Sequence, residues 1–319
     1  MTKKLLYFIL LISIPAVSQP YQIGHVSATF NDPARSRDID VEIYYPSDVL
    51  GNNVAVTAGE FPILAFGHGF VMGFDAYENI WTSLVPQGFI MIFPKTEGGI
   101  LPSHNEFAKD LNFTIARMQA LTLDNTSIFF GKVSSKAALM GHSMGGGAAF
   151  LAAGMNPLVN ALAVLAPAET NPSAIAAAGG LSIPALIFAG SNDCVTPPPA
   201  NQIPMYDAMQ SACKTYISII GGSHCQMADS NFLCSFGEAT CSPSAAISRE
   251  AQHAVINNYL GDWLLAQLNS DCTAGAAFDS QIGIDTAITF QKTCLQCNAL
   301  AVNDNVRSQI SVYPNPVSS

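Results

Sequence analysis

Short apolar runs alternate with segments of helical periodicity along most of the chain, and this alternation restricts the fold more than any other feature of the sequence. Apolar residues recur at helical spacing from Phe107 to Met118 and, with one polar interruption at Gln267, from Ile256 to Gln267. Strands that are buried on both faces of a sheet read as continuous apolar runs. The order therefore predicts an α/β fold with a mostly parallel central sheet flanked by helices on both faces. The expected strands lie at 41–45, 63–66, 89–93, 137–140, 161–165, 185–188 and 216–220.

The composition suits a folded chain with a large core. Of the 319 residues, 49% are hydrophobic and 11% are charged, which excludes a disordered or collagen-like chain. The 13 Lys and Arg residues against 23 Asp and Glu residues give a net charge of −10. A chain with this balance has no basic stripe to neutralise a phosphate backbone, so nucleic acid is not an expected partner. We expect one main domain with additional segments, acting as a monomer.

The first 18 residues have the pattern of a secretory signal peptide. A basic start at Met1–Lys4 precedes an apolar run at Leu5–Ile14 and the small-residue stretch Ala16–Ser18. The apolar run is shorter than the roughly 20 residues that a membrane-spanning helix needs. We therefore expect cleavage after Ser18 and export of a soluble protein to an oxidising compartment; an uncleaved membrane anchor is the alternative.

The segment Gly141-His142-Ser143-Met144-Gly145 carries the sharpest chemical signal. It follows the strand expected at 137–140 and precedes a run of small residues that opens a helix. A nucleophile on a tight turn between strand and helix needs small neighbours, because the backbone is strained and the helix packs closely. The helix N-terminus would also direct the Met144 N–H toward a developing oxyanion. Ser143 is therefore the candidate nucleophile of an acyl-transfer reaction, with a structural glycine turn as the alternative.

A serine nucleophile requires a base and an acid that orients the base. Asp193 follows the strand at 185–188, and His224 follows the strand at 216–220, so both lie at strand carboxyl ends as Ser143 does. His224 is the candidate general base and Asp193 its partner. Glu169 and Asp207 are the alternative acids. The other histidines, which are expected to be structural, are His25, His68, His104, His142 and His253.

The loop Gly67-His68-Gly69-Phe70 follows an earlier strand, where its glycines would allow a close approach to substrate. We expect the Phe70 N–H to be the second oxyanion donor beside that of Met144. The side chains of Phe70, Met144, Val195 and Phe74 would form an uncharged apolar surface for an acyl or aromatic group. Ordinary core packing is the alternative for Phe70.

These motifs together resemble the bacterial polyester hydrolase, cutinase and lipase branch of the α/β-hydrolases over roughly residues 40–268. The resemblance implies a serine ester hydrolase in which Ser143, Asp193 and His224 form the catalytic triad and Met144 and Val195 contact substrate. Such enzymes usually carry Pro-Trp after the strand that ends here at Leu165, whereas this chain has Pro167-Ala168. Ala168 would leave a wider cleft in which an aromatic ester unit stacks less well.

Eight cysteines lie between residues 194 and 297 without the spacing of a zinc module, so disulfides are expected. A bridge from Cys194 to Cys225 would join the acid and base loops, since each cysteine directly follows its catalytic residue. Many other connectivities stay open. The remaining candidate pairs are Cys213 with Cys272, Cys234 with Cys241, and Cys294 with Cys297.

The C-terminal segment ends in Ser311–Pro316, and this stretch resembles the opening of a sorting domain of bacterial type IX secretion. Such domains continue further, so the sequence is expected to stop short of a complete one; a chance match is the alternative. The expected division is a signal peptide at 1–18, a catalytic domain at 19–270, a cysteine-containing extension at 271–302, and a linker with the start of the sorting domain at 303–319.

Two further classes of function remain beside a polyester hydrolase. A general short-chain carboxylesterase or lipase would share these motifs. A catalytically inactive binding module would lack one member of the triad, whereas this chain has all three candidates. A peptidase is disfavoured because no lid insertion separates Leu165 from Asp193. The expected partners are an apolar ester or polyester and, through the C-terminal segment, secretion machinery. No motif calls for a metal ion or an organic cofactor.

Overall fold

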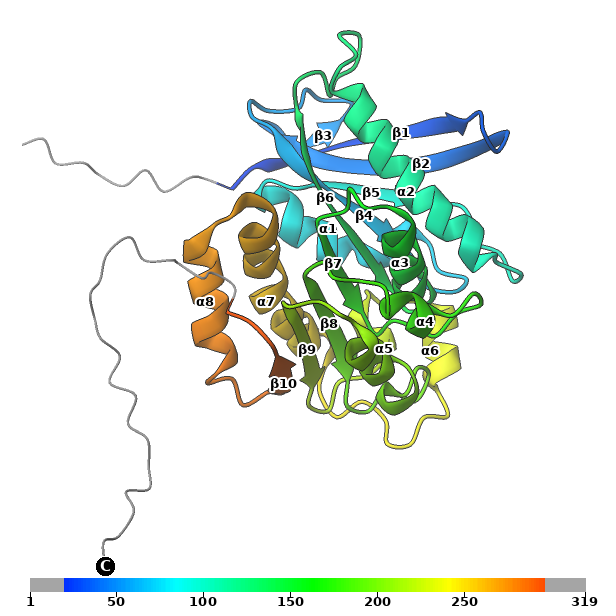
Figure 1. Ribbon diagram of the computed structural model, residues 1–319, viewed down its shortest axis with the longest axis vertical. Coiled ribbons are helices and arrows are strands. Elements are labelled where there is room, and N and C mark those ends of the chain that lie inside the picture. Colours follow the sequence, from blue (N-terminus) through cyan, green and yellow to red (C-terminus); the bar gives the residue numbers. More distant parts are fainter. Residues whose placement is uncertain (1–19, 296–319) are drawn as a thin grey trace, which may run out of the picture.

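The computed structural model describes residues 20–295 and forms one ten-stranded sheet within them. Its strand order is β10-β9-β8-β7-β6-β4-β5-β2-β1-β3, and the run from β9 to β5 is parallel (Figure 1). The strands β2 and β10 pair antiparallel with the two ends of that run. The bounds are β1 Gln22–Asp32, β2 Arg37–Ser47, β3 Gly51–Asn52, β4 Phe61–Gly67, β5 Ile90–Pro94, β6 Val133–His142, β7 Ala161–Leu165, β8 Ala185–Gly190, β9 Lys214–Ile219 and β10 Ile288–Lys292.

Helices cover both faces of the sheet, and the strand side chains alternate between the two cores. In β4, Ile63 and Ala65 join the core under α2 to α5, whereas Leu64 and Phe66 join the core under α1, α7 and α8. The predicted α/β fold class is therefore confirmed. The helix bounds are α1 Glu78–Leu84, α2 His104–Leu121, α3 Met144–Met155, α4 Ala174–Ala178, α5 Gln202–Ala208, α6 Phe232–Glu238, α7 Arg249–Asn269 and α8 Cys272–Ile282.

The segment after residue 270 packs on this same sheet. Phe278 of α8 is fully buried beside Tyr259 of α7, and β10 pairs with β9 so that Lys292 lies opposite Thr215. Two residues further along this register, Cys294 bonds to Cys213. The predicted pairs of Cys213 with Cys272 and of Cys294 with Cys297 are therefore wrong, because the antiparallel edge strand brings Cys294 to Cys213.

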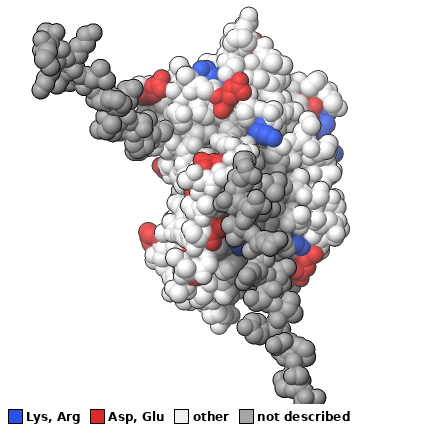
Figure 2. Space-filling model, turned by 60° about the vertical axis from the view of Figure 1, so that its left-hand side comes forward, with Lys and Arg blue, Asp and Glu red and all other residues white. Residues whose placement is uncertain are grey.

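The two terminal segments predicted as a signal peptide and as the start of a sorting domain lie outside the described residues, as does Cys297. Among the helices of residues 20–295, none is both long enough and apolar enough to cross a membrane. The face shown in Figure 2 carries a small number of acidic and basic side chains, interspersed on a mostly uncharged surface.

The parallel strands fix the position of the loops that carry the candidate chemistry. Ser143 follows β6, Asp193 follows β8, and His224 follows β9. Because β6, β7, β8 and β9 are parallel neighbours, their carboxyl ends meet at one edge of the sheet.

Candidate active site

Ser143 stands on a strained turn between β6 and α3. Its backbone has φ 55° and ψ −122°, outside the conformations that a serine readily adopts. Hydrogen bonds hold this turn in place, from the Ser143 N–H to the Leu165 carbonyl at 3.0 Å and from the Ala168 N–H to the Ser143 carbonyl at 2.9 Å. The strain is therefore maintained by the neighbouring strand β7 and the loop after it.

Glycines on two segments let the nucleophile turn approach the loop after β4. A Cβ atom on Gly67 would lie 2.9 Å from the Gly145 Cα, and one on Gly145 would collide with the Gly67 carbonyl. Both contacts are closer than real Cβ atoms tolerate. This pair of glycines therefore brings the start of α3 against the loop that leads to Phe70.

Ser143, His224 and Asp193 form a continuous hydrogen-bonded chain of buried side chains. The Ser143 Oγ lies 2.9 Å from His224 Nε2, and His224 Nδ1 lies 2.8 Å from Asp193 Oδ2. A carboxylate can only accept a hydrogen bond, so Nδ1 carries the proton and Nε2 is free to accept from the serine hydroxyl. This arrangement can deprotonate Ser143 as it attacks a carbonyl carbon.

Thr196 completes the environment of the acid, and sequence reasoning missed it. Its hydroxyl donates to Asp193 Oδ2 at 2.9 Å and lies 3.0 Å from His224 Nδ1, while its N–H donates to Asp193 Oδ1 at 2.8 Å. The Val195 N–H donates to the same Oδ1 at 2.9 Å. Together with His224, four donors satisfy a carboxylate whose side chain is inaccessible to solvent. The only sequence signal for Thr196 is its place in the turn after Asp193.

His142 links the loop after β4 to the catalytic base. Its Nε2–H donates to the His224 carbonyl at 3.2 Å, and its Nδ1 accepts from the Tyr77 hydroxyl at 3.1 Å. That hydroxyl in turn accepts from the Gly69 N–H at 2.7 Å. Burial, and then the nearby positive charge that His224 can carry, lower the pKa of His142 well below its usual value. His142 is thus a neutral bridge between two loops of the site, which agrees with the structural role expected for it.

The other alternative residues lie in structural positions. The Glu169 carboxylate accepts from the Ile175 N–H near the start of α4, and Asp207 is exposed on α5. His253 lies on α7, and its ring is 3.1 Å from the carbonyl of Ala228, in the loop before α6. None of these three contributes to the chain of hydrogen bonds around Ser143.

A cavity of about 320 Å³ opens directly beside Ser143 and His224. Phe70 and Val195 line it, as expected, and Val71 and Met72 join them. Met144 is buried at the start of α3 and does not line the cavity, nor does Ala168. The lining is mostly apolar, so it suits an uncharged group.

Phe74 also departs from expectation. It packs on Trp81, with ring centroids 6.3 Å apart, and is absent from the cavity lining. The reason is local, because residues Phe74–Tyr77 form a short 3₁₀ helix that leads into α1. The Phe74 ring therefore packs against Trp81 of α1 and does not line the cavity beside Ser143.

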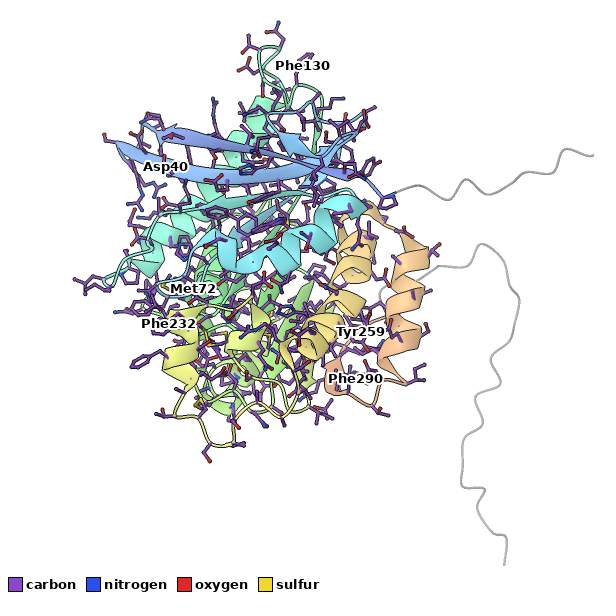
Figure 3. All side chains as sticks on the ribbon, turned by 180° about the vertical axis from the view of Figure 1, so that it is seen from behind. Asp40, Met72, Phe130, Phe232, Tyr259 and Phe290 are labelled. Carbon is purple, nitrogen blue, oxygen red and sulfur yellow. A yellow bond between two sulfur atoms is a disulfide. The ribbon has the colours of Figure 1, made fainter. Side chains whose placement is uncertain are left out.

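Helix α6 forms the remaining wall of the cavity and was not expected from the sequence. Leu233, Cys234, Phe236 and Gly237 line the cavity together with residues of the loops that follow the strands. Figure 3 labels Phe232 of this helix and Met72 near each other on the same side of the molecule, well away from Phe130.

The disulfides next to the triad join both catalytic loops to the α6 segment. Cys194 bonds to Cys241, and Cys225 bonds to Cys234. The predicted bridge from Cys194 to Cys225 and the local closure of Cys234 with Cys241 are therefore wrong. The physical reason is that the segment after His224, which contains α6, supplies both partner cysteines, so each catalytic loop is bonded to this segment and not to the other loop.

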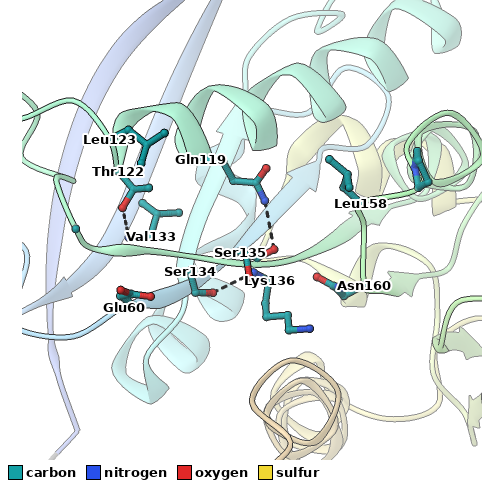
Figure 4. A pocket seen from close by; sticks show the side chains of 12 residues that line it. Glu60, Gln119, Thr122, Leu123, Val133, Ser134, Ser135, Lys136, Leu158 and Asn160 are labelled. Atoms are coloured by element: carbon teal, nitrogen blue, oxygen red, sulfur yellow. Dashed lines mark hydrogen bonds between the residues drawn. The ribbon is translucent and has the colours of Figure 1, made fainter.

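A larger hollow of about 720 Å³ lies at the other end of β6, where Val133–Lys136 enter the sheet (Figure 4). Its lining includes Glu60, Gln119 and Asn160. Parallel α/β sheets bind substrates at the carboxyl ends of their strands. The smaller cavity beside Ser143 is therefore the better candidate, although the hollow at the amino end holds more volume.

Comparison with known proteins agrees with this geometry. A family model described as PET hydrolase-like matches residues 38–239. Cutinase 1 of Thermobifida cellulosilytica is 32% identical over 183 residues, which make up 57% of this chain and 64% of that protein. Cutinase est1 of Thermobifida alba is 26% identical over 183 residues, 57% of this chain and 56% of that protein. The chain thus spans less than two thirds of the length of these relatives.

Proposed function

This chain belongs to the PET hydrolase-like family, and from that premise we propose that it is a serine hydrolase that cleaves carboxylic esters, with polyesters as its substrate class. One observation carries the proposal. The Ser143 Oγ lies 2.9 Å from His224 Nε2, and the opposite ring nitrogen is held by the buried Asp193 carboxylate.

The proposed reaction proceeds through an acyl-enzyme. His224 Nε2 takes the hydroxyl proton as Ser143 Oγ attacks the ester carbonyl carbon, and the oxyanion is stabilised by the N–H groups of Met144 and Phe70. Collapse of this intermediate breaks the bond to the alcohol, which leaves with the proton from His224. A water molecule then repeats the sequence on the acyl group, with His224 again as base and then acid, and releases the carboxylic acid and free Ser143.

The cavity supports an apolar substrate. Phe70 and Val195 flank Ser143, and the described lining contains no Lys, Arg, Asp or Glu side chain. The two similar proteins compared above are named cutinases, which supports an ester substrate for this chain. Ala168 replaces the indole that would stack on an aromatic unit, so we rank a short-chain carboxylesterase as the second candidate.

We also propose that the enzyme is exported. The disulfides of the described residues fit an oxidising, extracellular setting. The signal-like sequence at 1–18 and the sorting-domain-like sequence at 303–319 support passage through the type IX machinery. Cell fractionation with and without residues 303–319 tests this, and retention of both forms inside the cell would contradict it.

Turnover of two substrates tests the main proposal. The wild-type protein and Ser143→Ala are incubated with p-nitrophenyl butyrate and with amorphous poly(ethylene terephthalate) film. We expect wild type alone to release p-nitrophenol from the first and terephthalate products from the second. Hydrolysis of the soluble ester alone would favour the carboxylesterase, and activity that survives in Ser143→Ala would refute the mechanism.

A further inference from the structure

We propose that α6 is a covalently held recognition wall, on which Leu233 and Phe236 bind the apolar chain of the ester that extends beyond the scissile bond. This inference rests on the proposed ester hydrolysis and assigns the specificity of the same site. Its occupant is an uncharged, elongated aliphatic or aromatic segment, as a polyester presents.

The first argument is continuity with the nucleophile. Leu233 and Phe236 line the same cavity as Ser143 and His224. When the carbonyl carbon of a substrate reaches Ser143 Oγ, a long chain attached to it can therefore extend along the cavity to Leu233 and Phe236 of α6. Phe70 and Val195 line the same cavity and are also partly exposed, so the chain would meet apolar side chains from several segments.

The second argument is the exposure of α6 itself. No residue of α6 is buried, and the side chains of Phe236 and Leu233 are 74% and 51% exposed. A seven-residue helix is too short to be stable in water on its own. Such a helix keeps large apolar side chains in solvent only if something other than core packing holds it in place.

Three links hold α6 against the catalytic loops. Cys234 bonds to Cys225, which follows the base, and Cys241 bonds to Cys194, which follows the acid. Between them, the Glu238 carboxylate accepts from the His224 N–H at 2.7 Å and from the Cys225 N–H at 3.2 Å. The exposed wall therefore has a fixed position relative to the triad without being buried.

The third argument concerns charge. Between Asp229 and Arg249 the sequence contains one charged residue, Glu238, and its carboxylate is engaged by the backbone of the base loop. The outer surface of α6 thus presents apolar side chains with no ionic group to bind a charged partner. This selects an uncharged substrate chain over a carboxylate, a phosphate or a basic peptide.

The test uses Leu233→Ala and Phe236→Ala, with Phe130→Ala as the matched control. Phe130 is 52% exposed on the turn before β6, at the far end of the molecule (Figure 3). Each protein is assayed for kcat/KM on p-nitrophenyl acetate and p-nitrophenyl octanoate. In parallel, each substitution is combined with Ser143→Ala, and binding of p-nitrophenyl octanoate is measured by calorimetry.

We expect each α6 variant to lose about tenfold in kcat/KM on the octanoate and about tenfold in affinity for it, because a large apolar contact is removed. Turnover of the acetate should change less than about twofold, and Phe130→Ala should match wild type throughout. Equal losses on both esters would overturn the inference, since α6 would then act by supporting the triad.

Octanoate binding and turnover unchanged in both α6 variants would also overturn the inference. If wild type hydrolyses neither ester, the proposed function fails. The calorimetric arm still decides whether α6 binds the chain.

Discussion

The nucleophile turn and α6 contribute to the lining of one cavity but are held in place by different means. Residues Met144–Ala153 of α3 are all buried, and the turn before them is fixed by close backbone contact with Gly67. Helix α6 buries none of its residues. It is fixed by the Cys225–Cys234 disulfide, by the Glu238 carboxylate, and by the Cys194–Cys241 disulfide just after its end. The catalytic side depends on packing, and the recognition side depends on covalent links.

This difference follows from what each side has to do. Bond making requires Ser143, His224 and Asp193 to keep a hydrogen-bonded geometry to within about 0.5 Å, and close packing provides that precision. Binding a long apolar chain requires exposed apolar side chains, which cannot at the same time be anchored by burial. Disulfides to the acid and base loops resolve this conflict, because they hold α6 in place without burying its side chains.

The largest effect is expected from Asp193→Asn on the packed side. An amide can donate a hydrogen bond to His224 Nδ1 and so favour the wrong tautomer, which should lower kcat on p-nitrophenyl acetate about 10³- to 10⁴-fold. The control is Asp207→Asn, an exposed carboxylate on α5. A loss of less than about tenfold in Asp193→Asn would show that the buried acid is not needed to orient the base.

The next largest effect is expected from removal of the disulfide that holds the α6 segment, compared with removal of the disulfide at the edge of the sheet. The double variants Cys194→Ser/Cys241→Ser and Cys213→Ser/Cys294→Ser open bridges that span 47 and 81 residues. Each should lower the free energy of unfolding by about 2 to 4 kcal/mol in denaturant titrations. Of the two variants, only Cys194→Ser/Cys241→Ser should also lower kcat/KM on p-nitrophenyl octanoate, by about tenfold. Equal activity of the two variants would mean that α6 keeps its position without the link.

The smallest effect is a pH dependence of stability on the packed side. The pKa of buried His142 lies below its unfolded value of 6.5, so below about pH 6.5 the unfolded chain binds a proton that the folded chain excludes. The free energy of unfolding should therefore fall on acidification, by up to about 1.4 kcal/mol per pH unit from this residue. Guanidinium titrations at pH 7.5 and 5.5 measure it.

His142→Gln supplies the control for this pH effect. Its amide N–H can still donate to the His224 carbonyl, and its oxygen can accept from Tyr77, but it cannot titrate. The difference in unfolding free energy between the two pH values should be smaller in this variant. An equal difference would place the acid sensitivity elsewhere in the protein.

The sheet and the positions of the triad candidates could be predicted because both follow local rules. Continuous apolar runs indicate buried strands, and parallel strands bring their carboxyl ends to one edge, so Ser143, Asp193 and His224 were expected to converge. The structure places them within hydrogen-bond distance of one another. Their catalytic roles remain the proposal that the experiments above test.

The disulfides and α6 could not be predicted because both depend on the path of a non-periodic segment. Residues 229–248 carry no strand or helix pattern long enough to be recognised, and Cys234 gives no sign of which loop it meets. The pair of Cys213 with Cys294 depends on the register of β10, a short edge strand with exposed residues at its centre. Thr196 was missed for a similar reason, since a threonine in a turn has no distinctive spacing.

Covalent labelling tests the central claim most directly. Wild-type protein is incubated with an apolar alkylphosphonate p-nitrophenyl ester, in which a serine oxygen displaces p-nitrophenolate from phosphorus and remains bonded to it. Peptide mapping by mass spectrometry then locates the adduct. We predict one phosphonyl group on Ser143, one equivalent of p-nitrophenol released, and no labelling of Ser143→Ala. An adduct on another residue, or none while esterase activity persists, would contradict Ser143 as the nucleophile.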